Sequence, residues 1–237
     1  MRDQTPSQFS TLNHILNALP AEDFERLLPH LKKVSLSLGQ VLYRADEPIK
    51  HVYFPDNAMI SVIATTSDGQ CAEVGVVGRE GFSGIDVLMG VDSTSHQGVV
   101  QIADGALQIS TEAIRKEFKL GGAFHDLSLF YMHAMMMQIS QTALCNRLHS
   151  IEQRLARWLL MCHDRSASDQ LTLTQEFLSI MLGVNRPTVT TAALVLQGGG
   201  FIKYSRGKII VLDREGLEDF ACDCYDVVKP EYDRLTR

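Results

Sequence analysis

A long helical segment in the middle of the chain limits how the rest can fold. Residues 123–148 contain no Pro or Gly, and apolar side chains recur there with alternating gaps of three and four residues. Such heptad spacing is typical of a helix that packs along a partner helix. The predicted seam consists of Leu127, Phe130, Ala134, Met137, Gln141, Leu144 and Leu148.

This seam predicts self-association into a homodimer. Gln141 is a polar residue in an otherwise apolar seam, and such a residue helps to fix the register of two paired helices. Other faces of the segment are apolar as well, because Leu129, Met135, Met136 and Ile139 lie off the seam. Packing of this helix against the chain's own domains is therefore the alternative interpretation.

The region before the long helix has the pattern of short strands. Residues 8–31 carry apolar residues at helical spacing, interrupted by Pro20, which predicts short amphipathic helices. Farther on, β-branched and aromatic runs alternate with turn signals such as Gly78. These runs predict an antiparallel roll or barrel, followed by a short helix near 111–118. The expected strands cover 41–43, 52–54, 59–64, 72–77, 98–102 and 106–109.

The region after the long helix is predicted to be helical at first. An amphipathic helix begins at Ile151, and two shorter helices follow. Thr174 is a suitable N-cap for the first of these, which ends at Leu182, and Gly183 permits the left-handed backbone of a sharp turn. Asn185 caps the second, which extends to about residue 197. The side chains expected to be buried in these helices include Leu155, Trp158, Leu159, Cys162, Val189, Ala192, Ala193 and Leu196.

A basic hairpin is predicted over 198–212, with its turn at residues 205–207. The net charge of the chain is −6, yet residues 149–212 contain seven Lys and Arg against four Asp and Glu. A basic block inside an acidic protein is what a localised phosphate-binding surface leaves in a sequence. The predicted DNA contacts are Thr174, Asn185, Arg186, Pro187, Thr188, Thr190, Thr191, Lys203, Arg206 and Lys208.

The physical basis of this prediction is the type of side chain at each place. Arg186 lies in the first turn of the second helix, where an arginine can pair with the edge of a guanine in the major groove. Threonines of the same helix can reach bases or phosphates, and the hairpin cations can meet the backbone. A winged helix that is used only for protein contacts is the alternative interpretation.

On these residues the chain resembles the Crp/Fnr superfamily of bacterial transcription regulators. The resemblance is most specific over 173–190, LTQEFLSIMLGVNRPTVT, and includes Gly200-Phe-Ile and Gly207-Lys-Ile-Ile-Val. It implies an α+β fold with an N-terminal antiparallel, cyclic-nucleotide-binding-like β-roll over 1–122, a dimerisation helix over 123–148, and a C-terminal winged helix-turn-helix domain over 149–237. Pro187 and Thr191 stand where the family's activators often carry Glu and a second Arg, so a different binding-site preference is expected.

The resemblance also implies an effector site in the first domain. Residues 76–83 resemble the start of the family's phosphate-binding cassette, in which a short helix offers N–H groups to an anion. The cyclic-nucleotide binders add an arginine about ten residues later, but no arginine occurs between Arg79 and Arg115. We therefore expect an effector other than cyclic AMP, unless Arg79 or the partner subunit's Arg147 supplies the charge. The residues implied in effector binding are Arg79, Glu80, Gly81, Phe82, Ser83, Ser93, Thr94 and Ser95.

The cysteines favour neither a disulfide framework nor a metal site. Five are scattered along the chain without a C-x-x-C pair, so no metal and no cofactor are expected. Cys222 and Cys224 could form a redox pair or bind a metal, but no second group of ligands lies near them in the sequence. Free thiols are the preferred interpretation.

No catalytic residues are predicted, and the chain is not expected to be an enzyme. The sequence has no Gly-x-Ser-x-Gly elbow, Walker loop or dinucleotide fingerprint, and His51 alone cannot supply a cupin-type metal set. The sequence has no signal peptide or long apolar run, which predicts a cytoplasmic protein without a membrane partner. The expected partners are double-stranded DNA with a palindromic site, a second copy of the chain, and RNA polymerase. A cyclic-nucleotide-sensing or protein-binding adaptor that does not bind DNA is the alternative.

Overall fold

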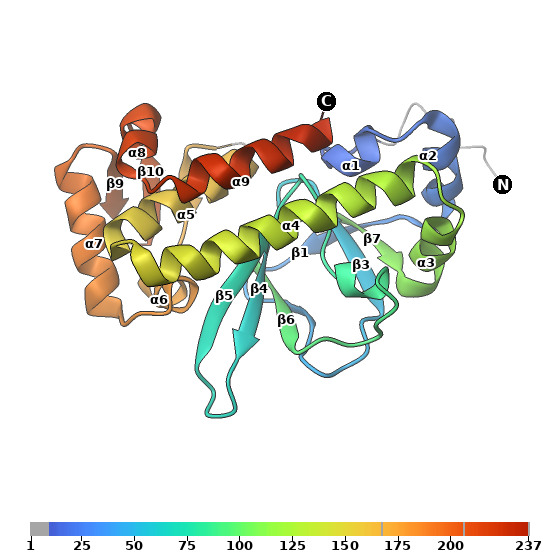
Figure 1. Ribbon diagram of the computed structural model, residues 1–237, viewed down its shortest axis with the longest axis horizontal. Helices are drawn as coiled ribbons and strands as arrows, with labels where there is room; N and C mark the ends of the chain where they lie inside the picture. Colours follow the sequence, from blue (N-terminus) through green and yellow to red (C-terminus); the bar gives the residue numbers. More distant parts are fainter. Residues whose placement is uncertain (1–9, 167, 206, 237) are drawn as a thin grey trace. The chain divides into compact units, whose positions relative to one another are not determined.

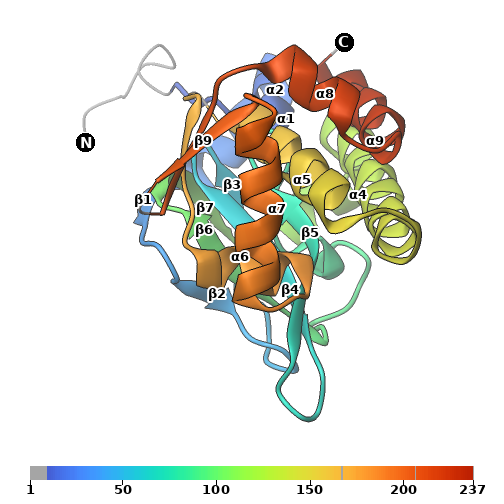
Figure 2. The same ribbon diagram turned by 90° about the vertical axis from the view of Figure 1, so that its left-hand side faces the viewer.

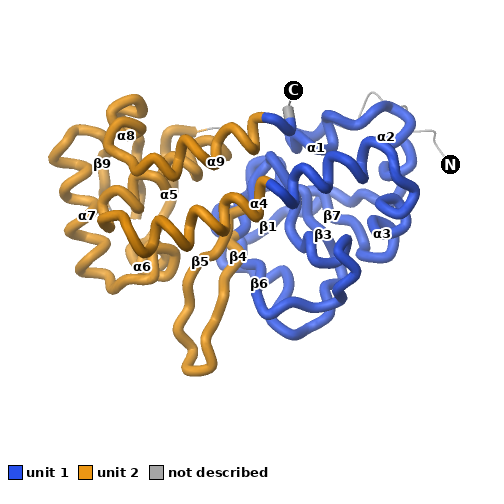
Figure 3. The backbone as a smooth tube through the Cα atoms, in the orientation of Figure 1, with its two compact units in different colours: residues 1–60, 77–133, 234–237 blue, residues 61–76, 134–233 orange. Residues whose placement is uncertain are grey.

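The computed structural model describes residues 10–166, 168–205 and 207–236, which form two compact units (Figure 3). Among the described residues, unit 1 contains residues 10–60, 77–133 and 234–236, and unit 2 contains residues 61–76, 134–166, 168–205 and 207–233. Residues 8 and 9 of the expected N-terminal helices, and Arg206 of the expected hairpin turn, lie outside the described residues. No helix in the described ranges is long and apolar enough to cross a membrane.

Unit 1 is built around antiparallel strands (Figure 1). Its N-terminal helices are α1 (His14–Asn17), α2 (Ala21–Leu27) and the 3₁₀ helix η2 (Leu28–His30). A three-stranded sheet has the order β1-β7-β3, and a four-stranded sheet has the order β2-β6-β4-β5. The strands are β1 (Lys32–Leu36), β2 (Val41–Tyr43), β3 (His51–Pro55), β4 (Met59–Thr65), β5 (Cys71–Val77), β6 (His96–Ile102) and β7 (Asp104–Ser110). Most of β4 and β5 belongs to unit 2, which contains residues 61–76.

The expected strands are confirmed, and one strand was missed. In β7, Ala106, Leu107 and Ile109 are buried, and Leu107 lies opposite Phe54 of β3. The missed strand is β1, which pairs with the other edge of β7. Because only Leu36 of β1 is buried, its sequence lacks the run of apolar residues by which the other strands were recognised.

An aromatic cluster fills the centre of unit 1. The ring of Phe82 lies 5.1 Å from that of Phe54 and 4.9 Å from that of Tyr131, measured between centroids. Gly81 lies against the same tyrosine, and a Cβ atom at this position would come within 1.9 Å of the ring. Glycine is therefore required here for close packing, and the segment that resembles a phosphate-binding cassette is anchored in the core.

Helix α3 (Thr111–Lys119) confirms the short helix expected near 111–118. Helix α4 (Ala123–Leu148) has the bounds expected for the long helix. Gly121 and Gly122 precede it, both with a left-handed backbone, and they separate α4 from α3. One face of α4 is buried within the chain, with Phe124, Tyr131, Ala134, Met135, Gln138 and Cys145 among its residues.

Unit 2 contains the later helices and a small sheet. They are α5 (Ile151–Arg165), α6 (Gln175–Leu182), α7 (Arg186–Gly198), α8 (Arg214–Phe220) and α9 (Cys224–Asp233). The strands β8 (Gln170–Thr172), β9 (Ile202–Ser205) and β10 (Lys208–Val211) form an antiparallel sheet in the order β8-β10-β9. The hairpin β9–β10 confirms the expected wing strands, and Gly207 has the left-handed backbone that its turn requires.

The sequence after Asp213 is polar and acidic and predicts one solvated helix, but the structure there differs. The segment from Arg214 onward forms α8, α9 and the 3₁₀ helix η4 (Arg234–Thr236). Helix α9 is not a solvated tail, because Tyr225, Val228 and Tyr232 are buried on one of its faces. The hydroxyl group of Tyr232 donates a hydrogen bond to Gln138 Oε1 of α4 over 3.2 Å. The apolar residues of α9 are interleaved with acidic ones, which hid this face in the sequence.

Candidate nucleic-acid interface

Helices α6 and α7 form a helix-turn-helix on the face of unit 2 that is turned toward the viewer in Figure 2. Thr174 caps α6 by accepting a hydrogen bond from the N–H group of Phe177. Gly183 ends α6 with φ = 63°, a left-handed conformation that a side chain would strain. The apolar face expected for α7 is confirmed, since four of its side chains are buried: Val189, Ala192, Ala193 and Leu196.

The first turn of α7 is fixed by its N-cap. The Asn185 side chain accepts hydrogen bonds from the backbone N–H of Thr188 over 3.0 Å and from its hydroxyl group over 2.8 Å. Pro187 lies in this first turn, where no intrahelical N–H bond is lost. Asn185, Arg186 and Pro187 are exposed, and Thr191 is exposed one turn later. A rigid helix N-terminus therefore offers the guanidinium group of Arg186 and the hydroxyl oxygen of Thr191 to the solvent.

Two residues of α6 that were not among the predicted contacts hold the side chains of Arg186 and Thr190 on α7. Glu176 Oε2 forms a salt bridge with the Arg186 guanidinium group over 2.9 Å. Gln175 Nε2 donates a hydrogen bond to Thr190 Oγ1 over 3.1 Å. Both contacts join residues that are distant in sequence, and only the crossing of the two helices brings them together. No local pattern marks such pairs.

The hairpin β9–β10 lies beside these helices. A shallow pocket is lined by Thr174, Gln175, Glu176, Arg186, Tyr204, Ser205 and Gly207. The backbone N–H of Tyr204 donates to Gln197 Oε1 of α7 over 2.9 Å, which ties the hairpin to that helix. Partial burial raises the pKa of Tyr204. Lys203 and Lys208 are exposed on the two strands, so the wing adds positive charge next to the first turn of α7.

Helix α5 packs against both α6 and α7. Its predicted core residues Leu155, Trp158, Leu159 and Cys162 are all buried, which confirms the amphipathic pattern. Arg154 donates a hydrogen bond to the backbone carbonyl of Leu182 at the end of α6 over 2.5 Å. This contact fixes the start of the turn between the two helices.

The buried carboxyl group of Glu73 also contacts α5. The indole Nε1 of Trp158 donates to Glu73 Oε1 over 2.6 Å. Burial raises the pKa of Glu73 to about 7, although hydrogen bonds from Ser61 and Trp158 and the charges of Arg165 and Arg157 oppose the shift.

The predicted seam residues of α4 do not all lie on one surface of the single chain. Phe130, Leu144 and Leu148 are exposed, whereas Leu127, Met137 and Gln141 are half-buried and Ala134 is fully buried. Three further apolar side chains on α4 are exposed, namely Leu129, Met136 and Ile139. The long helix thus presents a broad apolar surface to the solvent.

The implied effector residues form no helix at Glu80–Ser83, which corrects the expectation of N–H groups in a helical turn. Residues 79 and 80 form a turn, and the 3₁₀ helix η3 (Ile85–Val87) begins later. The N–H of Gly81 bonds to the Gly78 carbonyl, and the N–H of Ser83 bonds to that of Tyr53. Phe82 belongs to the aromatic core. Internal bonds therefore use donors that the family resemblance assigned to an anion.

The remaining implied effector residues lie in a loop of unit 1. The Thr94 hydroxyl group lies 3.1 Å from His96 Nδ1, Ser93 is half-buried and Ser95 is exposed. Arg115 of α3 contacts Asp92 Oδ1 over 2.5 Å and donates to the carbonyl of Val91 over 2.9 Å. Arg115, the next arginine after Arg79 in the sequence, thus holds this loop.

Comparisons with known proteins agree with this architecture. The family model of the Crp-like helix-turn-helix domain matches residues 153–220. A search of curated protein sequences gives no match. Among solved structures, a transcriptional regulator of the Crp/Fnr family from Eubacterium rectale is similar with a TM-score of 0.67 and 16% identity, over 87% of this chain and 96% of that one.

Two further structures have the same fold. FixK2 from Bradyrhizobium japonicum has a TM-score of 0.66 at 16% identity, over 81% of this chain and 98% of its own. CLP from Xanthomonas campestris, described as a c-di-GMP responsive global regulator, has a TM-score of 0.62 at 18% identity, over 81% of this chain and 99% of its own. The protein thus contains a Crp-like helix-turn-helix domain at residues 153–220 and has the fold of the Crp/Fnr transcription regulators.

Proposed function

We propose that the protein is a sequence-specific DNA-binding transcription regulator. The observation that carries this proposal is the exposed first turn of α7, rigidly capped by Asn185 and flanked by the basic wing. In a helix-turn-helix the second helix enters the major groove with its N-terminal residues against the base edges. Arg186 is the residue that reads a guanine, and Thr190 and Thr191 line the same groove.

The remaining predicted contacts position the protein on the DNA backbone. Lys203 and Lys208 are exposed on the wing, where ammonium groups can neutralise phosphates. Thr174 lies at the N-terminus of α6, and helix N-termini bind phosphate through free N–H groups. Arg206, at the turn of the wing, joins this set by its place in the sequence.

The active form in this proposal is a homodimer that pairs through α4. The exposed Phe130, Leu144 and Leu148 supply apolar surface for a partner helix. Two recognition helices related by a two-fold axis would reach successive major grooves about 34 Å apart, which requires a roughly palindromic site. RNA polymerase is the further partner through which such a regulator acts.

A small-molecule effector of unit 1 would control this activity, and we propose that it is not cyclic AMP. The N–H groups of Gly81 and Ser83 form internal hydrogen bonds, and Arg115 is engaged with Asp92. Unless Arg79 or the partner subunit's Arg147 supplies the charge, a permanent phosphate charge buried there would lack a matching cation.

The decisive experiment is a gel-shift assay of the full-length protein with a library of genomic fragments at physiological salt. We expect a subset of fragments to shift at nanomolar protein, and their aligned sequences to share a palindrome. If no fragment shifts under any tested salt condition, the proposal is wrong and a protein-binding adaptor is favoured.

A further inference from the structure

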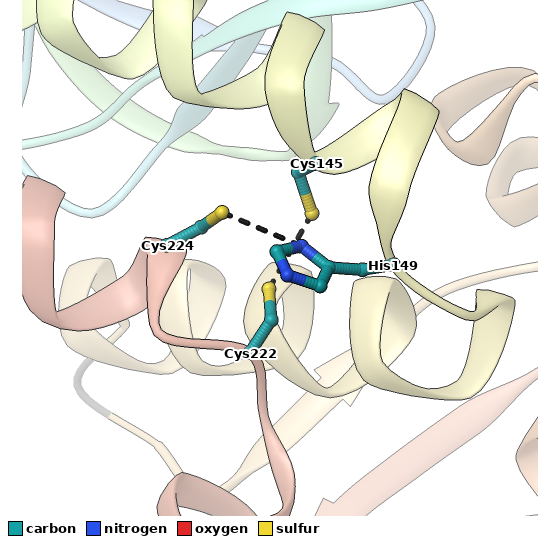
Figure 4. Close-up of side chains that lie close together, drawn as sticks. All are labelled: Cys145, His149, Cys222 and Cys224. Atoms are coloured by element: carbon teal, nitrogen blue, oxygen red, sulfur yellow. Dashed lines mark hydrogen bonds between the residues drawn. The ribbon is translucent and has the colours of Figure 1, made fainter.

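Four potential metal ligands from two distant parts of the sequence converge in unit 2 (Figure 4). Cys145 lies in the last turn of α4, and His149 follows this helix directly. Cys222 lies between α8 and α9, and Cys224 is the first residue of α9. No second group of ligands lies near Cys222 and Cys224 in the sequence, but in the fold the end of α4 and the residue that follows it bring Cys145 and His149 beside them.

The spacing of the four donor atoms fits a single metal ion. All four lie within 4.8 Å of one another. Cys145 Sγ is 3.4 Å from Cys222 Sγ, and Cys224 Sγ is 3.5 Å from His149 Nδ1. A tetrahedral zinc ion with Zn–S bonds of about 2.3 Å holds its sulfur ligands about 3.8 Å apart. The side chains are thus already at nearly the separations that such an ion imposes.

The environment of His149 fits a ligand as well. Its Nδ1 atom faces the sulfur atoms, and its Nε2 atom lies 3.6 Å from Asp223 Oδ1. Histidines that bind metal through one nitrogen usually direct the other toward a carboxylate or carbonyl group, which fixes the ring and its tautomer. Asp223 lies between the two cysteines in the sequence, so the same short segment supplies two ligands and the group that orients a third.

The burial and the charge of this group of residues also fit a bound metal ion. Cys145, Cys222 and Cys224 are 1%, 4% and 0% exposed. One zinc ion with three thiolates and a neutral imidazole carries a net charge of −1. The buried Arg157 interacts electrostatically with Cys145, and within the described ranges its Nε atom has no hydrogen-bond partner. The guanidinium group would balance the charge of the occupied site.

We propose that Cys145, His149, Cys222 and Cys224 bind one Zn²⁺ ion in a closed, structural Cys₃His site. Four protein ligands complete the tetrahedral coordination, so no position is left for water or substrate. The ligand pairs flank the helix-turn-helix domain in the sequence, because residues 153–220 lie between His149 and Cys222. The ion would therefore fasten the end of α4 to the segment that leaves the DNA-binding domain.

Other chemistry of the same thiols fits the arrangement less well. A disulfide between Cys145 and Cys222 would use two of the four groups and leave Cys224 and His149 without a role. An iron–sulfur cluster is larger than one ion and holds its ligand atoms farther apart than these four lie. The site is also independent of the proposed DNA contacts, because none of its side chains belongs to them.

The first test is the metal content of the full-length protein, purified under reducing conditions without a chelator. We expect one zinc per chain after gel filtration. After exchange with Co²⁺, we expect the intense visible bands of tetrahedral cobalt together with sulfur-to-cobalt charge transfer in the near ultraviolet. Protein without zinc that also takes up neither Zn²⁺ nor Co²⁺ stoichiometrically would overturn the proposal, as would a Cys145–Cys222 disulfide that persists in reductant.

Substitutions assign the ligands. Cys145→Ser and Cys222→Ser should each weaken zinc binding more than about 100-fold, measured by competition with a chromophoric chelator. Cys71→Ser is the matched control, because Cys71 lies outside the cluster and only half-buried. Equal zinc binding by Cys71→Ser and Cys145→Ser would contradict the assignment.

Two further variants keep the test valid if loss of a ligand unfolds the domain. Cys224→His retains a zinc donor and should keep a stoichiometric ion with an altered cobalt spectrum. Asp223→Asn changes an exposed side chain and should weaken zinc binding about tenfold while the far-ultraviolet circular dichroism stays the same. An unchanged zinc affinity in Asp223→Asn would contradict the role of Asp223 in orienting the His149 ring.

Discussion

The guanidinium group of Arg186 forms an exposed salt bridge with Glu176, across the crossing of α6 and α7. Both side chains are more than half exposed, so water and salt screen the pair and its contribution to the stability of the fold is small. The contact nevertheless holds the arginine at the mouth of the pocket beside the wing. Binding of a guanine edge by Arg186 would require exchange of this carboxylate for the base.

Removal of that carboxylate should strengthen DNA binding. An exposed ion pair costs up to about 1 kcal/mol to break, so Glu176→Gln should lower the Kd for a cognate site about two- to fivefold. The matched control is Glu215→Gln, which removes the same charge from an exposed position on α8. Filter-binding assays at fixed salt measure the Kd of both variants for the same DNA site. If both variants lowered the Kd equally, the cause would be the loss of one negative charge from the protein and not the release of Arg186.

Direct readout and backbone contacts should separate in two further variants. Arg186→Ala should cost about 1–3 kcal/mol of binding and relax the preference at one base pair in each half-site. Lys208→Ala should weaken all sequences similarly and flatten the dependence of binding on salt. Selection from a randomised site, combined with salt titrations, checks both. The same sequence-independent loss in both variants would exclude base readout by Arg186.

The dimer should depend on the exposed side of α4. Leu144 is 45% exposed in the single chain, so Leu144→Glu does not require burial of a charge within the monomer. In a paired seam the substitution places two like charges together and should shift the protein to monomers. Asn146→Glu, exposed on a different face of the same helix, is the control. Sedimentation of the wild-type protein as a monomer at micromolar concentration would contradict the proposed seam.

The stability of the protein should fall as the pH rises through the titration range of Glu73. Burial raises the pKa of Glu73 to about 7 from an ordinary value of 4.5, so between these values the folded chain holds a proton that the unfolded chain has released. Folding then becomes less favourable with rising pH, until the loss is complete above about pH 7.

Glu73→Gln should abolish this loss. The variant should exceed the wild type by about 2–3 kcal/mol in free energy of unfolding at pH 8 and differ little near pH 4.5. Denaturant titrations at several pH values measure the difference, with the exposed Glu215→Gln as a control for charge removal. Parallel curves for wild type and Glu73→Gln would show that Glu73 titrates at its ordinary pKa.

Cyclic nucleotides should bind unit 1 weakly or not at all. Calorimetric titration of the ligand-free protein with cyclic AMP and cyclic GMP should give dissociation constants in the millimolar range or no heat of binding. The physical reason is that hydroxyl groups of Ser93, Thr94 and Ser95 cannot replace a guanidinium charge against a buried phosphate. Micromolar binding that also tightens DNA affinity would refute this prediction.

Local signals in the sequence were sufficient for much of this fold. Helix α4 was delimited correctly because it lacks Pro and Gly and is preceded by two glycines. The helix-turn-helix was recognised from caps and a turn that depend on neighbouring residues, namely Thr174, Gly183 and Asn185. Each of these acts over three or four positions, within the reach of a sequence pattern.

Features that depend on tertiary contacts could not be predicted from the sequence. Strand β1 pairs with β7 although its own sequence is mostly polar, because the partner strand supplies the hydrogen bonds. A turn at Glu80 takes the place of the expected helix because Phe82 and Gly81 pack against Tyr131 in the core. Cys145 and Cys222 meet although 77 positions separate them, and only the path of α5 to α8 closes that distance.

The contact between Trp158 and Glu73 gives the protein a spectroscopic probe of its own. Trp158 is the only tryptophan in the chain, is 6% exposed, and donates its indole N–H to a carboxyl group that changes charge near neutral pH. Its emission intensity and wavelength therefore depend on the protonation of that one group. Unlabelled protein can report, through a single tryptophan excited selectively, the electrostatic state of the core around α5.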